Sequence, residues 1–117
     1  MGTLRINESF SFVSGDDSYS PPRINNVVTV SGNKRMSGVA SIGTTEETLP
    51  LGDIATVGWV VIRNLDSTNF ITIGTTTGQL GMKLKAGESC SFRASANNIY
   101  LKADTAACNV SYDIFSD

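Results

Sequence analysis

Apolar and polar side chains alternate with a two-residue period through the second half of the chain, and this rhythm restricts the fold more than any other feature. In residues 108–114 the even-numbered positions are apolar and the odd-numbered ones are polar. Residues 82–85 and 89–94 alternate in the same way. Successive side chains of a β-strand point to opposite faces of a sheet, so the pattern predicts strands with one buried and one solvated face.

Residues 57–62 lack this alternation because apolar side chains occupy both faces. Such a run is typical of a central strand covered on both sides, and it predicts a core position for Trp59. Turn-forming residues fill positions 64–69, and the β-branched run 70–74 follows them. We interpret the two strands and their connection as a hairpin with a long loop.

The first half of the chain is less regular. Residues 10–12 and 27–30 each indicate a strand, and residues 36–43 indicate another that is broken by Gly38. Residues 46–49 predict one helical turn at most. No segment has the 3.6-residue period of an amphipathic helix.

About eight short strands at regular spacing predict an all-β fold, a single β-sandwich with jelly-roll-like or immunoglobulin-like wiring. At 117 residues the chain has the size of one domain, 1–117. Charged residues make up only 17%, against about 25% in an average domain. Ser, Thr, Asn and Gly take their place, which favours strands and tight turns over helices.

An extended N-terminal arm is expected at residues 1–25, within the single domain. Residues 14–22 have the composition of an exposed loop, stiffened at its end by two prolines. The segment has enough apolar residues to dock on a neighbouring subunit by strand addition, but little regularity of its own. The residues predicted to contact a partner are Phe10, Phe12, Tyr19, Pro21 and Pro22.

The sequence offers no recognisable catalytic chemistry. It contains no histidine, so Ser-His-Asp and Cys-His arrangements are excluded, together with the usual general base near neutral pH. Cys90 and Cys108 lack the spacing of zinc ligands; we expect buried free thiols, with a disulfide between neighbouring strands as the alternative. Most acidic residues fall in turns, although a carboxylate pair of the glycosidase kind stays open. We therefore expect no enzyme, no catalytic residue, no metal site and no cofactor.

Charge and hydropathy argue against two classes of partner. The net charge is −2 without a basic run, which disfavours nucleic acid. No segment reaches the roughly 20 apolar residues that span a bilayer, and the start of the chain lacks a secretory signal. We therefore expect folding in a cytoplasm. The main basic cluster is interpreted as a solvated sheet face, with an anion site as the alternative. It consists of Lys83, Lys85, Arg93 and Lys102.

Five segments occur in an order and spacing that resemble a known group of proteins. They are residues 42–49 (IGTTEETL), 52–59 (GDIATVGW), 63–74 (RNLDSTNFITIG), 83–88 (KLKAGE) and 101–107 (LKADTAA). Together they resemble small structural proteins of tailed bacteriophages, over about residues 42–114. Residues 1–41 add little to the resemblance.

The resemblance implies a virion accessory protein without an active site. Its expected role is that of a capsid cement or decoration protein that binds the major capsid protein, or another virion protein, and stabilises the head shell. It implies a homo-oligomer, with a trimer favoured because it suits the threefold positions of a shell. It also implies location in the virion after assembly in the host cytoplasm, where free cysteines stay reduced.

Two other roles stay open from the sequence. One is a component of the tail, the fibre or the head–tail junction. The other is a carbohydrate- or receptor-binding module that uses Trp59, Tyr19 or Tyr100. An enzyme comes last.

Overall fold

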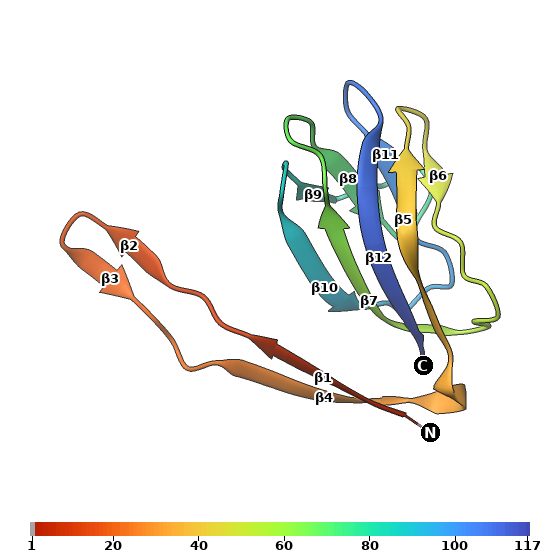
Figure 1. Cartoon of the computed structure of the whole chain (residues 1–117), viewed down its shortest axis with the longest axis horizontal. Helices are drawn as coiled ribbons and strands as arrows, with labels where there is room; N and C mark the ends of the chain where they lie inside the picture. The colour runs from red at the N-terminus through yellow and green to blue at the C-terminus, as the bar shows by residue number, and fades with distance from the viewer. Residues whose placement is uncertain (1) are drawn as a thin grey trace.

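Two four-stranded sheets face each other and form a β-sandwich (Figure 1), which confirms the predicted all-β fold. The computed structural model describes residues 2–117 of the chain. The first sheet consists, in spatial order, of β10 (Ser89–Arg93), β7 (Val57–Asn64), β12 (Cys108–Ser116) and β5 (Arg35–Ile42). The second consists of β6 (Glu47–Thr48), β11 (Tyr100–Ala103), β8 (Ile71–Gly74) and β9 (Met82–Leu84).

The strand pairing is nested. Among the eight strands of the two sheets, β5 pairs with β12 and β6 pairs with β11. Inside these pairs, β7 pairs with β10 and β8 pairs with β9, and every pair is antiparallel. A long hairpin of paired strands that folds over into two sheets is the wiring of a jelly roll. An immunoglobulin sandwich instead pairs its first two strands within one sheet, so the pairing decides between the two predicted wirings.

The core lies between the two sheets and follows from the alternation in the sequence. In β12 the even-numbered side chains are buried, as the pattern predicts. Each sheet contributes its inward positions, and full burial of one aliphatic side chain is worth about 1.5–3 kcal/mol. The largest fully buried apolar side chains are Ile42, Val60, Ile62, Ile71, Ile73, Ile99, Leu101, Val110 and Ile114.

The predicted hairpin of β7 and β8 is wrong, because the two strands lie in different sheets. Residues 64–69 cross from one sheet to the other. Asn64 is fully buried at this crossing, and its side-chain amide donates to the carbonyl oxygens of Asn69 (3.0 Å) and Leu84 (3.1 Å). Its Oδ1 accepts the Asp66 N–H at 3.0 Å. Turn-forming residues marked the connection, but they could not tell a reversal within a sheet from a crossing between sheets.

Two strand predictions for the first sheet also need correction. β5 runs unbroken through Gly38, which stands opposite Tyr112 in the register. A Cβ at Gly38 would come within 2.8 Å of the Tyr112 hydroxyl, so glycine is needed here for space. Trp59 is only half-buried, because the neighbouring Val60 takes the inward position and Trp59 points to the outer face. The Arg93 guanidinium lies 5.8 Å from its ring centroid.

The helical turn predicted at residues 46–49 does not form. Glu47 and Thr48 belong to β6, which pairs with β11. The only helical segment within residues 2–117 is a 3₁₀ turn, η1 (Ser31–Asn33).

The N-terminal segment forms a long hairpin outside the two sheets (Figure 1). Its strands are β1 (Gly2–Glu8), β2 (Phe12–Ser14), β3 (Asp17–Tyr19) and β4 (Ile24–Val30). β1 pairs with β4 near the sandwich, and β2 pairs with β3 at the far end. The radius of gyration is 15.4 Å, whereas a compact domain of this length has about 13 Å. The arm therefore projects from the body.

Replacing Asn64 with alanine should lower the free energy of unfolding by about 2–4 kcal/mol, because two carbonyls and one N–H lose their buried partner. Denaturant unfolding followed by circular dichroism measures the change. Asn109→Ala is the matched control, since Asn109 lies on the exposed face of β12, and its effect should stay within about 0.5 kcal/mol. Equal losses in the two variants would contradict a structural role for the Asn64 network.

Candidate interaction surface

The root of the arm lies against the outer face of the first sheet. β1 and β4 are in register so that Leu4 pairs with Val28, which places their side chains on the same face of the hairpin. Val28 and Val30 are each only 6% exposed, and Leu4 is half-buried. The opposite face, with Arg5 for example, is exposed. One apolar face therefore holds the root of the arm to the body.

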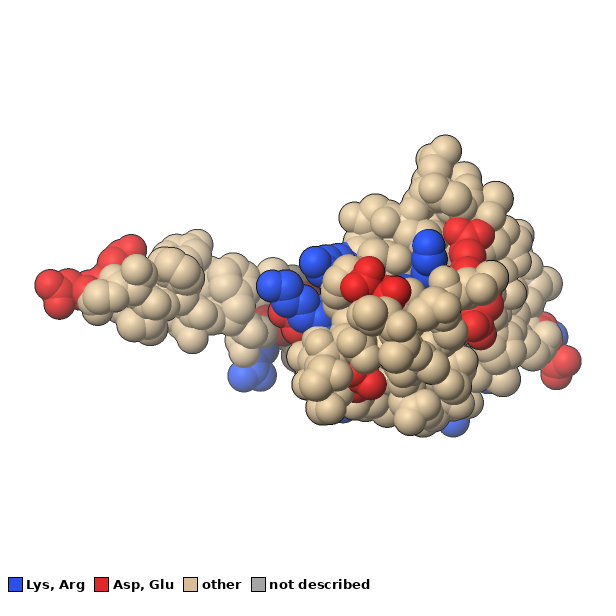
Figure 2. Space-filling model, turned by 90° about the horizontal axis from the view of Figure 1, so that it is seen from above, with Lys and Arg blue, Asp and Glu red and all other residues tan. Residues whose placement is uncertain are grey.

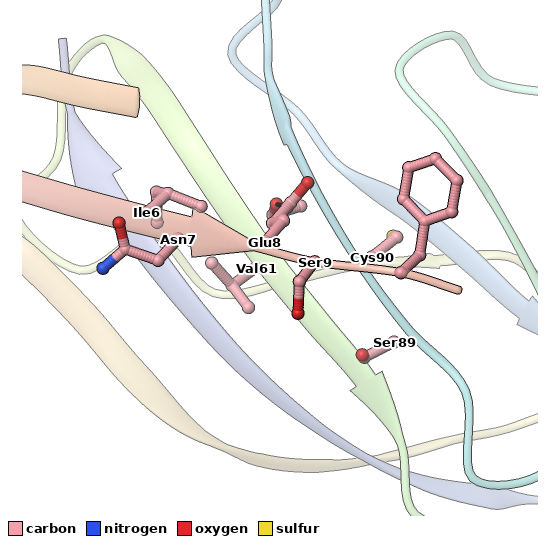
Figure 3. A pocket seen from close by; sticks show the side chains of 9 residues that line it. Ile6, Asn7, Glu8, Ser9, Val61, Ser89 and Cys90 are labelled. Atoms are coloured by element: carbon pink, nitrogen blue, oxygen red, sulfur yellow. Dashed lines mark hydrogen bonds between the residues drawn. The ribbon is translucent and has the colours of Figure 1, made fainter. Parts of the chain in front are cut away.

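A groove of about 710 Å³ runs between the arm and the edge strand β10 (Figure 3). In the close-up, Ile6 and Glu8 on the arm pass across Val61 of β7. The Ser91 hydroxyl donates to the Glu8 carboxylate at 2.6 Å, and this exposed bond joins the arm to β10. The groove is open and mixes polar with apolar groups; Cys90 also lines it.

Three of the predicted contact residues come together at the far end of the arm. Phe12 pairs with Tyr19 across β2 and β3, and the rings of Phe10 and Tyr19 are 6.3 Å apart at 55°. Phe10 and Phe12 are 55% exposed and Tyr19 is 57% exposed. We call these three residues the aromatic tip face. Val13, paired with Ser18, points to the opposite side of the hairpin.

The two predicted prolines do not join this face. Pro21 is half-buried and Pro22 is exposed, and both lie in the connection from β3 to β4. Ile24 and Val27 are exposed apolar residues on β4 that the sequence did not single out. Val27 lies on the exposed face of β4 opposite Arg5, whereas Ile24 lies on the same face as the buried Val28 but at the end of β4 farther along the arm.

The far end of the arm is acidic. Asp16 lies in the turn between β2 and β3, Asp17 is the first residue of β3, and no Lys or Arg occurs between residues 6 and 22. Figure 2 shows acidic side chains at the outer end of the arm and the nearest basic ones close to the body. The tip therefore combines exposed aromatic rings with negative charge.

Groups with reactive chemistry are scattered over the part of the chain that the structure describes. Cys90 and Cys108 are free thiols, and burial raises the pKa of both. No three His, Cys, Asp or Glu side chains gather where they could hold a metal ion among residues 2–117. The same residues include no helix long and apolar enough to cross a membrane.

The aromatic residues proposed for sugar binding do not share a site. Trp59 lies on the outer face of the first sheet, and Tyr100 lies on the outer face of the second, because its neighbour Leu101 is buried. Tyr19 belongs to the tip of the arm. Tyr19 lies beside Phe10 there, with the two ring centroids 6.3 Å apart.

Two carboxylates stabilise loops of the sandwich. Asp66 accepts the N–H groups of Asn69 (2.6 Å) and Thr68 (3.0 Å), and these bonds lower its pKa. Glu46 accepts the Thr77 hydroxyl and the Gly78 N–H, which lowers its pKa as well. Both carboxylates act as acceptors for loop amides, a structural role.

No protein-family model matches the chain, and a search of curated proteins found no match to it.

Acid should destabilise the protein partly through Asp66. Its lowered pKa means that the unfolded chain takes up this proton at a higher pH than the folded chain. The stabilisation is complete above the ordinary value of 3.8 and is lost as the pH falls through that value towards the folded pKa. The Asp66→Asn variant should therefore show a flatter decline of unfolding free energy below about pH 5 than the wild type.

Urea unfolding at a series of pH values measures this difference. Asp53→Asn is the control, because the Asp53 side chain is exposed and accepts no hydrogen bond from residues 2–117. An Asp66→Asn curve parallel to that of the wild type would show that the loop bonds do not depend on the charge.

Proposed function

We propose that this protein is a non-enzymatic structural component of a tailed-phage virion, a cement or decoration protein that binds and stabilises the head shell. The observation that carries the proposal is the aromatic tip face, held away from the body on a paired arm. The resemblance of residues 42–114 to small virion proteins gives the kind of assembly. The protein would act in the virion after assembly in the host cytoplasm.

Exposed aromatic rings at the end of an arm favour docking over chemistry. Large aromatic side chains supply much of the binding energy at protein interfaces, mainly where they enter a desolvated pocket. In the free chain the rings of Phe10, Phe12 and Tyr19 each keep more than half of their surface in solvent. A neighbouring subunit that covers them would gain this apolar area as binding energy.

The body of the protein has the properties of a rigid support. Its core lies between two hydrogen-bonded sheets, and the last strand, β12, is paired on both sides. The Glu8–Ser91 bond and the buried side chains of Val28 and Val30 attach the root of the arm to the body. A cement protein needs such an attachment between the body and the contact point.

Deleting residues 1–22 should leave a folded sandwich that no longer binds head shells. The sheets β5 to β12 do not include this segment, so their pairing is retained. Co-sedimentation with purified empty shells measures binding, and circular dichroism measures folding. The apparent affinity should fall at least about tenfold, since aromatic contacts of this kind are worth more than 1.4 kcal/mol together.

A second variant removes the tip without leaving β4 unpaired. Residues 9–23 are replaced by Asn-Gly, a two-residue turn that closes a hairpin at the last pair, Glu8 with Ile24. This variant should fold like the wild type and also fail to decorate shells. Full occupancy of shells by either variant would show that the arm is not the contact element.

A further inference from the structure

The outer face of the second sheet carries a row of lysines that faces away from the arm. Lys83 on β9 stands opposite Thr72 on β8, and Thr72 stands opposite Lys102 on β11. Directly opposed residues project from the same face of a sheet. Their neighbours Leu84 and Leu101 are buried in the core, so the row points outward.

Aromatic surface accompanies these lysines. The Lys83 ammonium lies 4.0 Å from the centroid of the Phe70 ring, which is half-buried. Lys85, two positions along the chain, is exposed as well. Three acids lie nearby: Glu46 interacts electrostatically with Lys102, the Asp104 N–H donates to the Phe70 carbonyl, and the Glu88 carboxylate accepts the Lys85 N–H at 2.8 Å. We call Phe70, Thr72, Lys83, Lys85 and Lys102 the lysine face; its defining feature is the row of Lys83, Thr72 and Lys102 across three paired strands.

The lysine face is complementary to the tip of the arm. The tip presents Asp16 and Asp17 without any basic residue in the surrounding segment 6–22. It also presents the aromatic tip face, and the lysine face offers the Phe70 ring beneath an ammonium group. Complementary charge steers two surfaces together and fixes their orientation, and apolar contact between the rings adds affinity.

The tip cannot reach the lysine face of its own chain. The arm lies against the outer face of the first sheet, where Glu8 bonds Ser91. The lysine face is on the outside of the second sheet, across the full thickness of the sandwich. In Figure 1 the tip of the arm, β2 and β3, lies well away from β8, β9 and β11, so a contact between the two surfaces would join separate copies.

We propose that the acidic aromatic tip of one copy docks on the lysine face of the next copy. The inference rests on the proposed function in one respect, that the arm is the contact element. The contact is head-to-tail, since it joins two different surfaces. Repeated contacts of this type close into a ring or continue as a filament. The assembled copies then bind the shell together, as one unit.

Charge reversal tests the pairing of these two surfaces. The variants Asp16→Lys/Asp17→Lys and Lys83→Glu/Lys102→Glu should each weaken self-association by about tenfold or more, because like charges then meet. A chain with all four changes should regain the wild-type assembly to within about threefold. Light scattering coupled to size-exclusion chromatography, over a concentration series, measures the assembly of each full-length variant.

A second pair of variants tests the aromatic contact. Phe12→Ser should weaken self-association, and Val13→Ser should leave it unchanged, because Val13 is 72% exposed on the other side of the hairpin. Both side chains lie in the same strand and are exposed, so a folding defect would affect both variants. Circular dichroism of each variant verifies the fold.

Three results would overturn the inference. The first is a wild-type chain that stays monomeric up to about 1 mM. The second is unchanged self-association when the charge of only one of the two surfaces is reversed. The third is a chain with all four substitutions that fails to regain the wild-type assembly. Co-sedimentation with shells distinguishes a wrong head-to-tail contact from a wrong proposed function. A monomer that still decorates shells through its arm contradicts only the head-to-tail contact. An assembly that ignores shells contradicts only the proposed function.

Discussion

Strand β12 is hydrogen-bonded on both sides, to β5 along its whole length and to β7 along most of it, and the rest of the structure depends on these two ladders. Its inward side chains, among them Val110 and Ile114, supply the middle of the core. The same strand also holds the arm. Ser116 at its end accepts the Lys34 N–H, just after η1, and donates to the carbonyl of Ser31, the first residue of η1. The central strand therefore joins the core to the root of the arm.

The sequence predicted the sheets better than their connections. Alternation identifies a strand and separates its two faces, and the buried positions of β12 followed that pattern. Alternation does not tell which sheet a strand joins, because both sheets have the same period. For that reason the sequence predicts a hairpin at residues 64–69, where the chain crosses between the sheets at Asn64. The core position predicted for Trp59 has another cause: residues 57–62 are apolar on both faces, so the pattern does not separate the inner face from the outer one. The nested pairing connects residues far apart in sequence, such as Met36 and Ile114. Local sequence patterns do not indicate which distant strands pair.

The candidate surfaces were predictable to a similar degree. Phe10 and Phe12 alternate with serines, so their common face could be derived from the sequence, but the partner of Phe12 across the hairpin could not. The basic cluster was recognised as a set, yet it divides between the sheets. Arg93 belongs to the first sheet and forms an ion pair with Asp117, whereas Lys83 and Lys102 share the second. A surface patch is defined by registers between strands, which only the folded chain specifies.

The nested pairing also determines the order in which the strands can pair during synthesis. Contacts between distant parts of a chain form slowly, because the loop between them must close first. β5 cannot complete its ladder until β12, the last strand, has left the ribosome. The arm, by contrast, consists of two local strand pairs, β1 with β4 and β2 with β3, all within the first 30 residues. During synthesis all four strands of the arm are therefore available for pairing while the first sheet still lacks β12.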